Sequence, residues 1–103
     1  MNLTQEQWAE QVKHDDDAVV LDVRTADEFN EVRLPRAVNI DIYKGQGFID
    51  EVNQLDKDRK YYVYCKAGGR SQQACQLMNN LGFTNTFNLE GGITQWRGEV
   101  VED

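Results

Sequence analysis

One stretch decides the fold: Lys60-Tyr61-Tyr62-Val63-Tyr64-Cys65-Lys66-Ala67-Gly68-Gly69-Arg70-Ser71. Residues 60–64 are rich in aromatic and β-branched side chains, which predicts a strand. Ser71 is a good helix N-cap, and the apolar residues after it follow helical spacing until Gly82 ends the pattern. Residues 65–71 therefore lie between the carboxyl end of a strand and the amino end of a helix, where open α/β sheets bind ligands.

Strands and helices alternate through the rest of the chain. The run 18–23 is apolar without alternation, as in a strand covered on both faces. We therefore expect one α/β domain over residues 1–103, with a mainly parallel central sheet flanked by helices on both faces. The other expected elements are a helix from the Thr4 capping box to near His14, a short helix opened by the Thr25 capping box, an extended segment 37–40, a helix 48–55, a strand 86–89 and a short helix after Gly92 that contains Ile93 and Trp96.

Length and charge limit the possible functions. A chain of 103 residues can build one hydrophobic core, and the net charge of −7 disfavours nucleic acid and anionic membranes as partners. No segment approaches the ~18 apolar residues of a membrane helix, and the amino terminus lacks the pattern of a secretion signal. We expect a cytoplasmic monomer whose two cysteines, Cys65 and Cys75, stay unpaired.

The loop after the strand is suited to a reactive thiol at Cys65. Loop and helix amides can point at one spot there, and Gly68 and Gly69 permit positive φ so that the loop can curl around the sulfur. Lys66 and Arg70 add positive charge, which lowers the pKa of a thiol. The alternative is an inert buried cysteine beside an ordinary glycine turn.

The chain resembles a rhodanese homology domain over nearly its whole length. The matching motifs, in order, are Leu21-Asp22-Val23-Arg24, Glu28-Phe29, Pro35 with Ala37, Asn39-Ile40, the C-x-x-G-x-R-S loop from Cys65 to Ser71, Gly82-Phe83 and Gly91-Gly92-Ile93 with Trp96.

The resemblance implies a sulfurtransferase in which Cys65 takes sulfur from a donor such as thiosulfate, becomes a persulfide and passes the sulfur to cyanide or a thiol. It also implies that the loop residues hold the substrate, namely Lys66, Ala67, Gly68, Gly69 and Arg70. The six-residue loop 65–70 is the length associated with sulfurtransferases. The related phosphatases use a loop one residue longer, so a cysteine phosphatase is disfavoured.

One segment departs from the family pattern. The usual Gly-His-Ile-Pro-Gly-Ala appears here as Val32-Arg33-Leu34-Pro35-Arg36-Ala37. If this segment lies at the rim of the site, Arg33 and Arg36 either attract an anionic donor or form part of a solvated loop.

Other chemistry-bearing residues have structural interpretations. Asp22, Arg24 and Glu28 predict ion pairs that hold loops, and Asp22 or Glu28 could orient Arg70. His14 is expected in solvent. Trp8, Trp96 and Cys75 are expected in the core, although Cys75 could instead form a disulfide with an oxidised Cys65 in a redox protein.

Two functions of different classes therefore remain open besides a redox role. The first is an enzyme that uses a small sulfur donor; the second is a sulfur-relay or interaction module fed by proteins. The sequence contains no ligand spacing for a metal and no nucleotide-binding glycine motif, so we expect neither a metal nor a cofactor.

Overall fold

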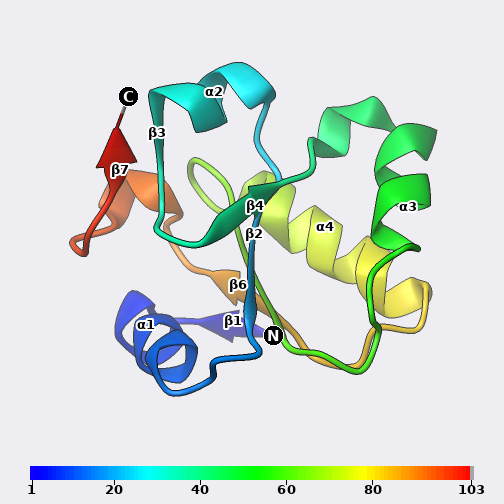
Figure 1. The fold of residues 1–103 in the computed structure, drawn as a ribbon, viewed down its shortest axis with the longest axis horizontal. Coiled ribbons are helices and arrows are strands. Elements are labelled where there is room, and N and C mark those ends of the chain that lie inside the picture. Colours follow the sequence, from blue (N-terminus) through cyan, green and yellow to red (C-terminus); the bar gives the residue numbers. More distant parts are fainter. Residues whose placement is uncertain (103) are drawn as a thin grey trace.

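The structure is a computed structural model that describes residues 1–102. Its centre is a five-stranded sheet in the order β1-β6-β5-β2-β4, and every neighbouring pair in it is parallel (Figure 1). The expected parallel sheet is confirmed. The elements are β1 (Asn2–Leu3), α1 (Gln5–Lys13), β2 (Val19–Asp22), α2 (Ala26–Glu31), β3 (Val32–Arg33), β4 (Ala37–Asn39), the 3-10 helix η1 (Ile42–Lys44), α3 (Gln46–Val52), β5 (Tyr61–Tyr64), α4 (Gly69–Asn80), β6 (Thr86–Leu89), the 3-10 helix η2 (Ile93–Gln95) and β7 (Val101–Glu102).

Apolar residues fill both faces of the sheet, as the unbroken apolar run of β2 predicts. Leu21 belongs to a core cluster under α3 and α4, whereas Val20 belongs to a second cluster under α1. Alternate side chains of a strand point to opposite faces, so one strand serves both cores. Helix α4 therefore packs on one face of a sheet whose opposite face is covered by α1.

The two capping boxes form as expected. The Thr4 and Thr25 side chains accept hydrogen bonds from the backbone amides of Gln7 and Glu28, and those two side chains accept bonds from the cap amides in return. They fix where α1 and α2 begin.

The expected N-cap of α4 is wrong. The N-cap is Gly68, with φ of 109°, and the helix begins at Gly69, three residues earlier than an N-cap at Ser71 predicts. That conformation is open to glycine and strained for other residues, so the chain turns into the helix before Ser71. The side chain of Ser71 is therefore buried in the first turn.

Short strands lie at the margins of the fold. β1 extends the main sheet beside β6, and β3 pairs antiparallel with β7 in a separate two-stranded sheet. Each has only two residues, which is too short to carry a recognisable apolar pattern.

Within residues 1–102 no helix is long and apolar enough to span a bilayer.

Candidate functional site

Cys65 directly follows β5 at the carboxyl edge of the parallel sheet. The residue is 1% exposed, and the chain passes from it through residues 66–68 into α4. β5 is the central strand, with β6 on one side and β2 on the other. The predicted place of the thiol, between a strand end and a helix start, is confirmed.

Two groups of the loop and helix donate hydrogen bonds toward the sulfur. The backbone amide of Gly68 lies 3.0 Å from Sγ of Cys65, and the hydroxyl of Ser71 lies 3.3 Å from it. Burial raises the pKa of Cys65, but hydrogen bonds from the Ser71 hydroxyl and from the amides of Ser71, Gly68 and Ala67 outweigh burial. The pKa of Cys65 is therefore lowered overall, so at a given pH a larger fraction of this thiol is ionised than in a free cysteine.

The two loop glycines have different roles. Gly68 has positive φ, as expected, whereas Gly69 is an ordinary helical residue with open space where a Cβ would lie. Gly69 does not use the positive φ that glycine permits, because the turn is completed at Gly68 and the helix has already begun.

A third glycine, Gly92, supports the loop from outside. Its φ is 59°, and a Cβ there would lie 2.4 Å from the carbonyl oxygen of Lys66 and 2.6 Å from that of Cys65. The same two carbonyls accept hydrogen bonds from the amides of Thr94 at 3.0 Å and Ile93 at 2.9 Å. The backbone of residues 92–94 therefore holds residues 65 and 66 in place only because position 92 has no side chain.

Arg70 is bound by α2 instead of being free at the site. Its two terminal nitrogens donate to the two carboxylate oxygens of Glu28 at 2.7 and 3.0 Å, and its guanidinium lies 5.4 Å from the ring centre of Tyr43. The bidentate bond from Arg70 lowers the pKa of Glu28 to about 2. Of the two alternatives for orienting Arg70, Glu28 is therefore confirmed.

Lys66, the residue that follows Cys65, is exposed to solvent. It lines a hollow of about 340 Å³ together with Arg24, Glu28, Glu31, Val32, Ile93, Thr94 and Val100. Two basic residues, Arg24 and Lys66, and two acidic residues, Glu28 and Glu31, line this hollow, so it carries no strong positive charge.

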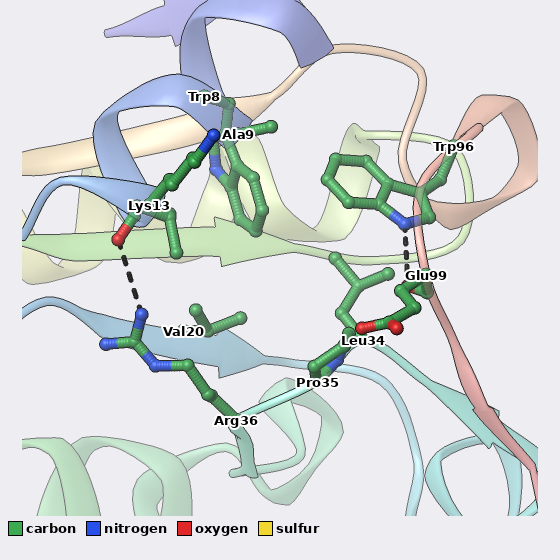
Figure 2. A pocket seen from close by; sticks show the side chains of 10 residues that line it. Trp8, Ala9, Lys13, Val20, Leu34, Pro35, Arg36, Trp96 and Glu99 are labelled. Atoms are coloured by element: carbon green, nitrogen blue, oxygen red, sulfur yellow. Dashed lines mark hydrogen bonds between the residues drawn. The ribbon is translucent and has the colours of Figure 1, made fainter. Parts of the chain in front are cut away.

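The departing segment 32–37 is split between two places. Val32 lines the hollow beside Lys66, as expected for the rim, but Arg36 turns away and donates to the carbonyls of Val12 at 3.3 Å and Ala18 at 3.0 Å. Figure 2 shows Arg36 reaching toward the end of α1, across a pocket of about 290 Å³ whose labelled lining includes Trp8 and Trp96.

Arg33 stacks on the ring of Phe29 at 5.0 Å and donates to the carbonyl of the same residue. Arg36 is exposed and bonded to the backbone of Val12 and Ala18, which favours the surface-loop alternative over donor attraction.

The ion pair at the end of β2 is structural, as expected. Arg24 donates to both carboxylate oxygens of Asp22, the closest at 2.7 Å, and to the carbonyl of Val32 at 2.6 Å. Both side chains are almost fully buried. Through the Val32 carbonyl, the pair ties β3 to the end of β2.

The expected positions of His14, Trp8 and Cys75 are confirmed, and Trp96 is half-buried at the edge of the second core cluster. His14 is exposed and pairs with Glu10, while Trp8 is buried and Trp96 packs edge-on against it. Cys75 is a free, buried cysteine in the first core cluster, and burial raises its pKa to about 11. Within residues 1–102 no cluster of three or more His, Cys, Asp or Glu side chains could hold a metal ion.

Two contributors to the site, Ser71 and Gly92, do not follow from local sequence patterns. Ser71 was assigned to the helix cap, and the contact of Gly92 with the loop depends on how β6 passes the carboxyl end of β5. The position of Ser71 six residues after Cys65 gives a signal only if the helix start is known.

Comparison with known proteins agrees with this geometry. The family model "Rhodanese-like domain" matches residues 5–99. The chain is 37% identical over 92 residues to YtwF of Bacillus subtilis, with 88% of this chain and 84% of that protein covered. It is 30% identical to the thiosulfate sulfurtransferase GlpE of Pseudomonas savastanoi pv. phaseolicola, with 84% and 78% covered.

Solved structures share the fold as well. A rhodanese-related protein of Thermoplasma volcanium matches with a TM-score of 0.83 and 30% identity, over 97% of this chain and 96% of that one. The parallel sheet, the cysteine at its edge and these matches lead to one conclusion: the chain belongs to the rhodanese-like family, whose members include sulfurtransferases.

Proposed function

We propose that the protein is a sulfurtransferase in which Cys65 carries sulfur as a persulfide. The observation that supports this most strongly is the buried sulfur of Cys65, which receives the Gly68 amide at 3.0 Å and the Ser71 hydroxyl at 3.3 Å. These donors stabilise negative charge on sulfur, which both the attacking thiolate and the persulfide carry.

The reaction has two displacements. The Cys65 thiolate attacks the outer, sulfane sulfur of thiosulfate; the sulfur–sulfur bond of the donor breaks, and sulfite leaves with the electron pair. A nucleophile such as cyanide then attacks the outer sulfur of the persulfide and leaves as thiocyanate, which regenerates the thiolate. Neither step needs an external oxidant or reductant, and the thiolate form removes the need for a general base.

We assign a separate role to each residue of the loop 66–70. The amides of Ala67 and Gly68 face the sulfur, the backbone of Gly69 starts the helix, and Lys66 draws an anionic donor to the mouth. Arg70, neutralised by Glu28, acts mainly by holding α2 against the loop.

The test is mass spectrometry of the intact protein after incubation with thiosulfate. We expect one added sulfur on the wild type and on Cys75→Ser, none on Cys65→Ser, and loss of the added mass when cyanide follows. Sulfur transfer at the wild-type rate by Cys65→Ser would overturn the proposal.

A second candidate is a relay module that receives sulfur from a protein. Two observations favour it over a thiosulfate enzyme: the chain has a net charge of −7, and Arg70 is already paired, which together weaken attraction for a small dianion. A protein persulfide as donor loads Cys65 in this case, whereas thiosulfate does not. Comparison of the two donors in the mass assay separates the candidates.

We also propose a single domain over residues 1–103, of which residue 103 lies outside the described residues, and a monomer in the cytoplasm. Light scattering of the purified protein and fractionation of cells test the last two predictions.

A further inference from the structure

Asn88 is buried behind the reactive loop, and the reaction proposed above does not use it. It lies on β6 and is 3% exposed. Its Oδ1 accepts a hydrogen bond from the Ser71 hydroxyl, while its Nδ2 donates to Oδ1 of Asn2 at 3.0 Å and lies 3.4 Å from the Gly68 carbonyl oxygen. Since that carbonyl can only accept, it fixes the amide orientation, with Oδ1 facing Ser71.

The single hydroxyl proton of Ser71 has three acceptors within reach. They are Sγ of Cys65 at 3.3 Å, the carbonyl oxygen of Gly68 at 3.1 Å and Oδ1 of Asn88. The Gly68 carbonyl already accepts the amide of Gln72 at 3.1 Å. The competition for the proton is therefore chiefly between the sulfur and Asn88.

We propose that Asn88 is a positioning residue that sets the acidity of Cys65 by competing for the Ser71 proton. When the thiol is neutral, Ser71 donates to Asn88. When the sulfur is ionised, the hydroxyl rotates and donates to Sγ, which leaves the buried Oδ1 of Asn88 without its donor. An unsatisfied buried acceptor costs free energy, so Asn88 opposes ionisation.

This opposition has a chemical use. Burial by itself favours the neutral thiol, and the loop amides with Ser71 lower the pKa of Cys65. A thiolate of very low pKa is a weak nucleophile, and attack on sulfur is fastest when the thiol pKa lies near the ambient pH. Asn88 reduces the extent to which the Ser71 hydrogen bond lowers the pKa of Cys65, and the thiolate is therefore more nucleophilic.

The charged groups around the thiol are few, so hydrogen bonding can dominate its acidity. Lys66 is on the loop, and Arg70 is the only charged residue of α4. β6 and η2 carry no charged side chain, and β2, which pairs with β5, ends in the buried Asp22–Arg24 ion pair. From α2, Glu28 is paired with Arg70 and Glu31 lines the hollow beside Lys66. Tyr64, which precedes Cys65, has a raised pKa and stays neutral.

The inference rests on Cys65 being the sulfur carrier, but its test needs no sulfur donor. The pH profile of iodoacetamide alkylation reports the pKa of Cys65, and trypsin separates the two cysteines into residues 61–66 and 71–97. Failure of sulfur loading would therefore overturn the proposed function and leave this measurement readable.

The experiment is a double-mutant cycle of Asn88→Leu and Ser71→Ala. Asn88→Leu removes the competing acceptor at similar size, and we expect the pKa of Cys65 to fall by about one unit. Alkylation below the pKa should be about threefold faster, because about tenfold more thiolate is partly offset by its lower nucleophilicity. Ser71→Ala should raise the pKa, and in that background Asn88→Leu should leave it unchanged. An equal shift in both backgrounds, or no shift in either, overturns the proposal.

Asn88→Asp gives an independent test should the leucine variant fail to fold. A carboxylate keeps the competing acceptor and adds charge, so the pKa of Cys65 should rise in both backgrounds, and by more where Ser71 is present. A rise of the same size without Ser71 shows a pure charge effect and contradicts the competition.

Discussion

Replacement of Gly92 by alanine should displace the reactive loop. The new Cβ would lie 2.4 Å from the Lys66 carbonyl oxygen, so the two segments must separate by about 1 Å to restore ordinary contact. The move weakens the hydrogen bonds from Ile93 and Thr94 to the loop, and alanine is strained at φ 59°, ψ −163°. Two hydrogen bonds at about 1 kcal/mol each and about 1 to 3 kcal/mol of strain give a loss of about 3 to 5 kcal/mol of stability.

Gly69→Ala is the matched control in the same site. Its added Cβ meets nothing within 4 Å, and position 69 is helical, where alanine is favoured over glycine by roughly 0.5 to 1 kcal/mol. Urea unfolding followed by tryptophan fluorescence measures stability, and thiocyanate formation measures transfer. We expect Gly92→Ala to lose stability and about a hundredfold in transfer rate, because a 1 Å misplacement costs that much.

Comparing Gly92→Ala with Gly69→Ala shows whether the available space at a position, and not merely its place in a Gly-Gly motif, decides the effect of an added side chain. Gly69 and Gly92 each belong to a Gly-Gly pair, and nothing in the sequence distinguishes the two positions. In the structure only position 92 has no room for a side chain. Equal losses in the two variants, or wild-type stability and transfer in Gly92→Ala, would refute the reasoning.

Three further predictions concern charges. Glu28→Gln should lower the free energy of unfolding by about 1 to 2 kcal/mol near neutral pH. Because folding lowers the Glu28 pKa from 4.5 to about 2, this difference from the wild type is present above pH 4.5 and is lost as the pH falls toward 2. Urea unfolding at several pH values measures it. Asp22→Asn should destabilise by about 3 to 5 kcal/mol in the same assay, since Arg24 is left buried without its counter-charge. Lys66→Gln should raise KM for thiosulfate and flatten its salt dependence while the Cys65 alkylation profile stays unchanged, because hydrogen bonds set the thiol pKa; a matching pKa shift would contradict this.

Local sequence signals predicted most of the fold. The Thr4 and Thr25 capping boxes mark helix starts within a few residues, and the apolar run of β2 indicates a strand buried on both faces. These features need only neighbouring residues. The same is true of the cysteine at the end of β5, which follows from where a strand pattern stops.

Features that depend on distant residues escaped prediction. Glu28 and Asp22 were both expected as possible partners of Arg70, and the choice of Glu28, 42 residues away, cannot be inferred from charge spacing along the chain. Ser71 looked like a cap because serine commonly caps helices, but the positive φ of Gly68 starts α4 earlier and turns that side chain to the sulfur.

The location of sulfur after loading tests the central claim most directly. Wild-type protein is incubated with a sulfane donor, alkylated and digested with trypsin, and the peptides 61–66 and 71–97 are weighed. The account predicts one extra sulfur on residues 61–66, which contain Cys65, and none on residues 71–97, which contain Cys75. Extra sulfur on the Cys75 peptide alone, or on neither peptide with thiosulfate and with a protein persulfide, would contradict it.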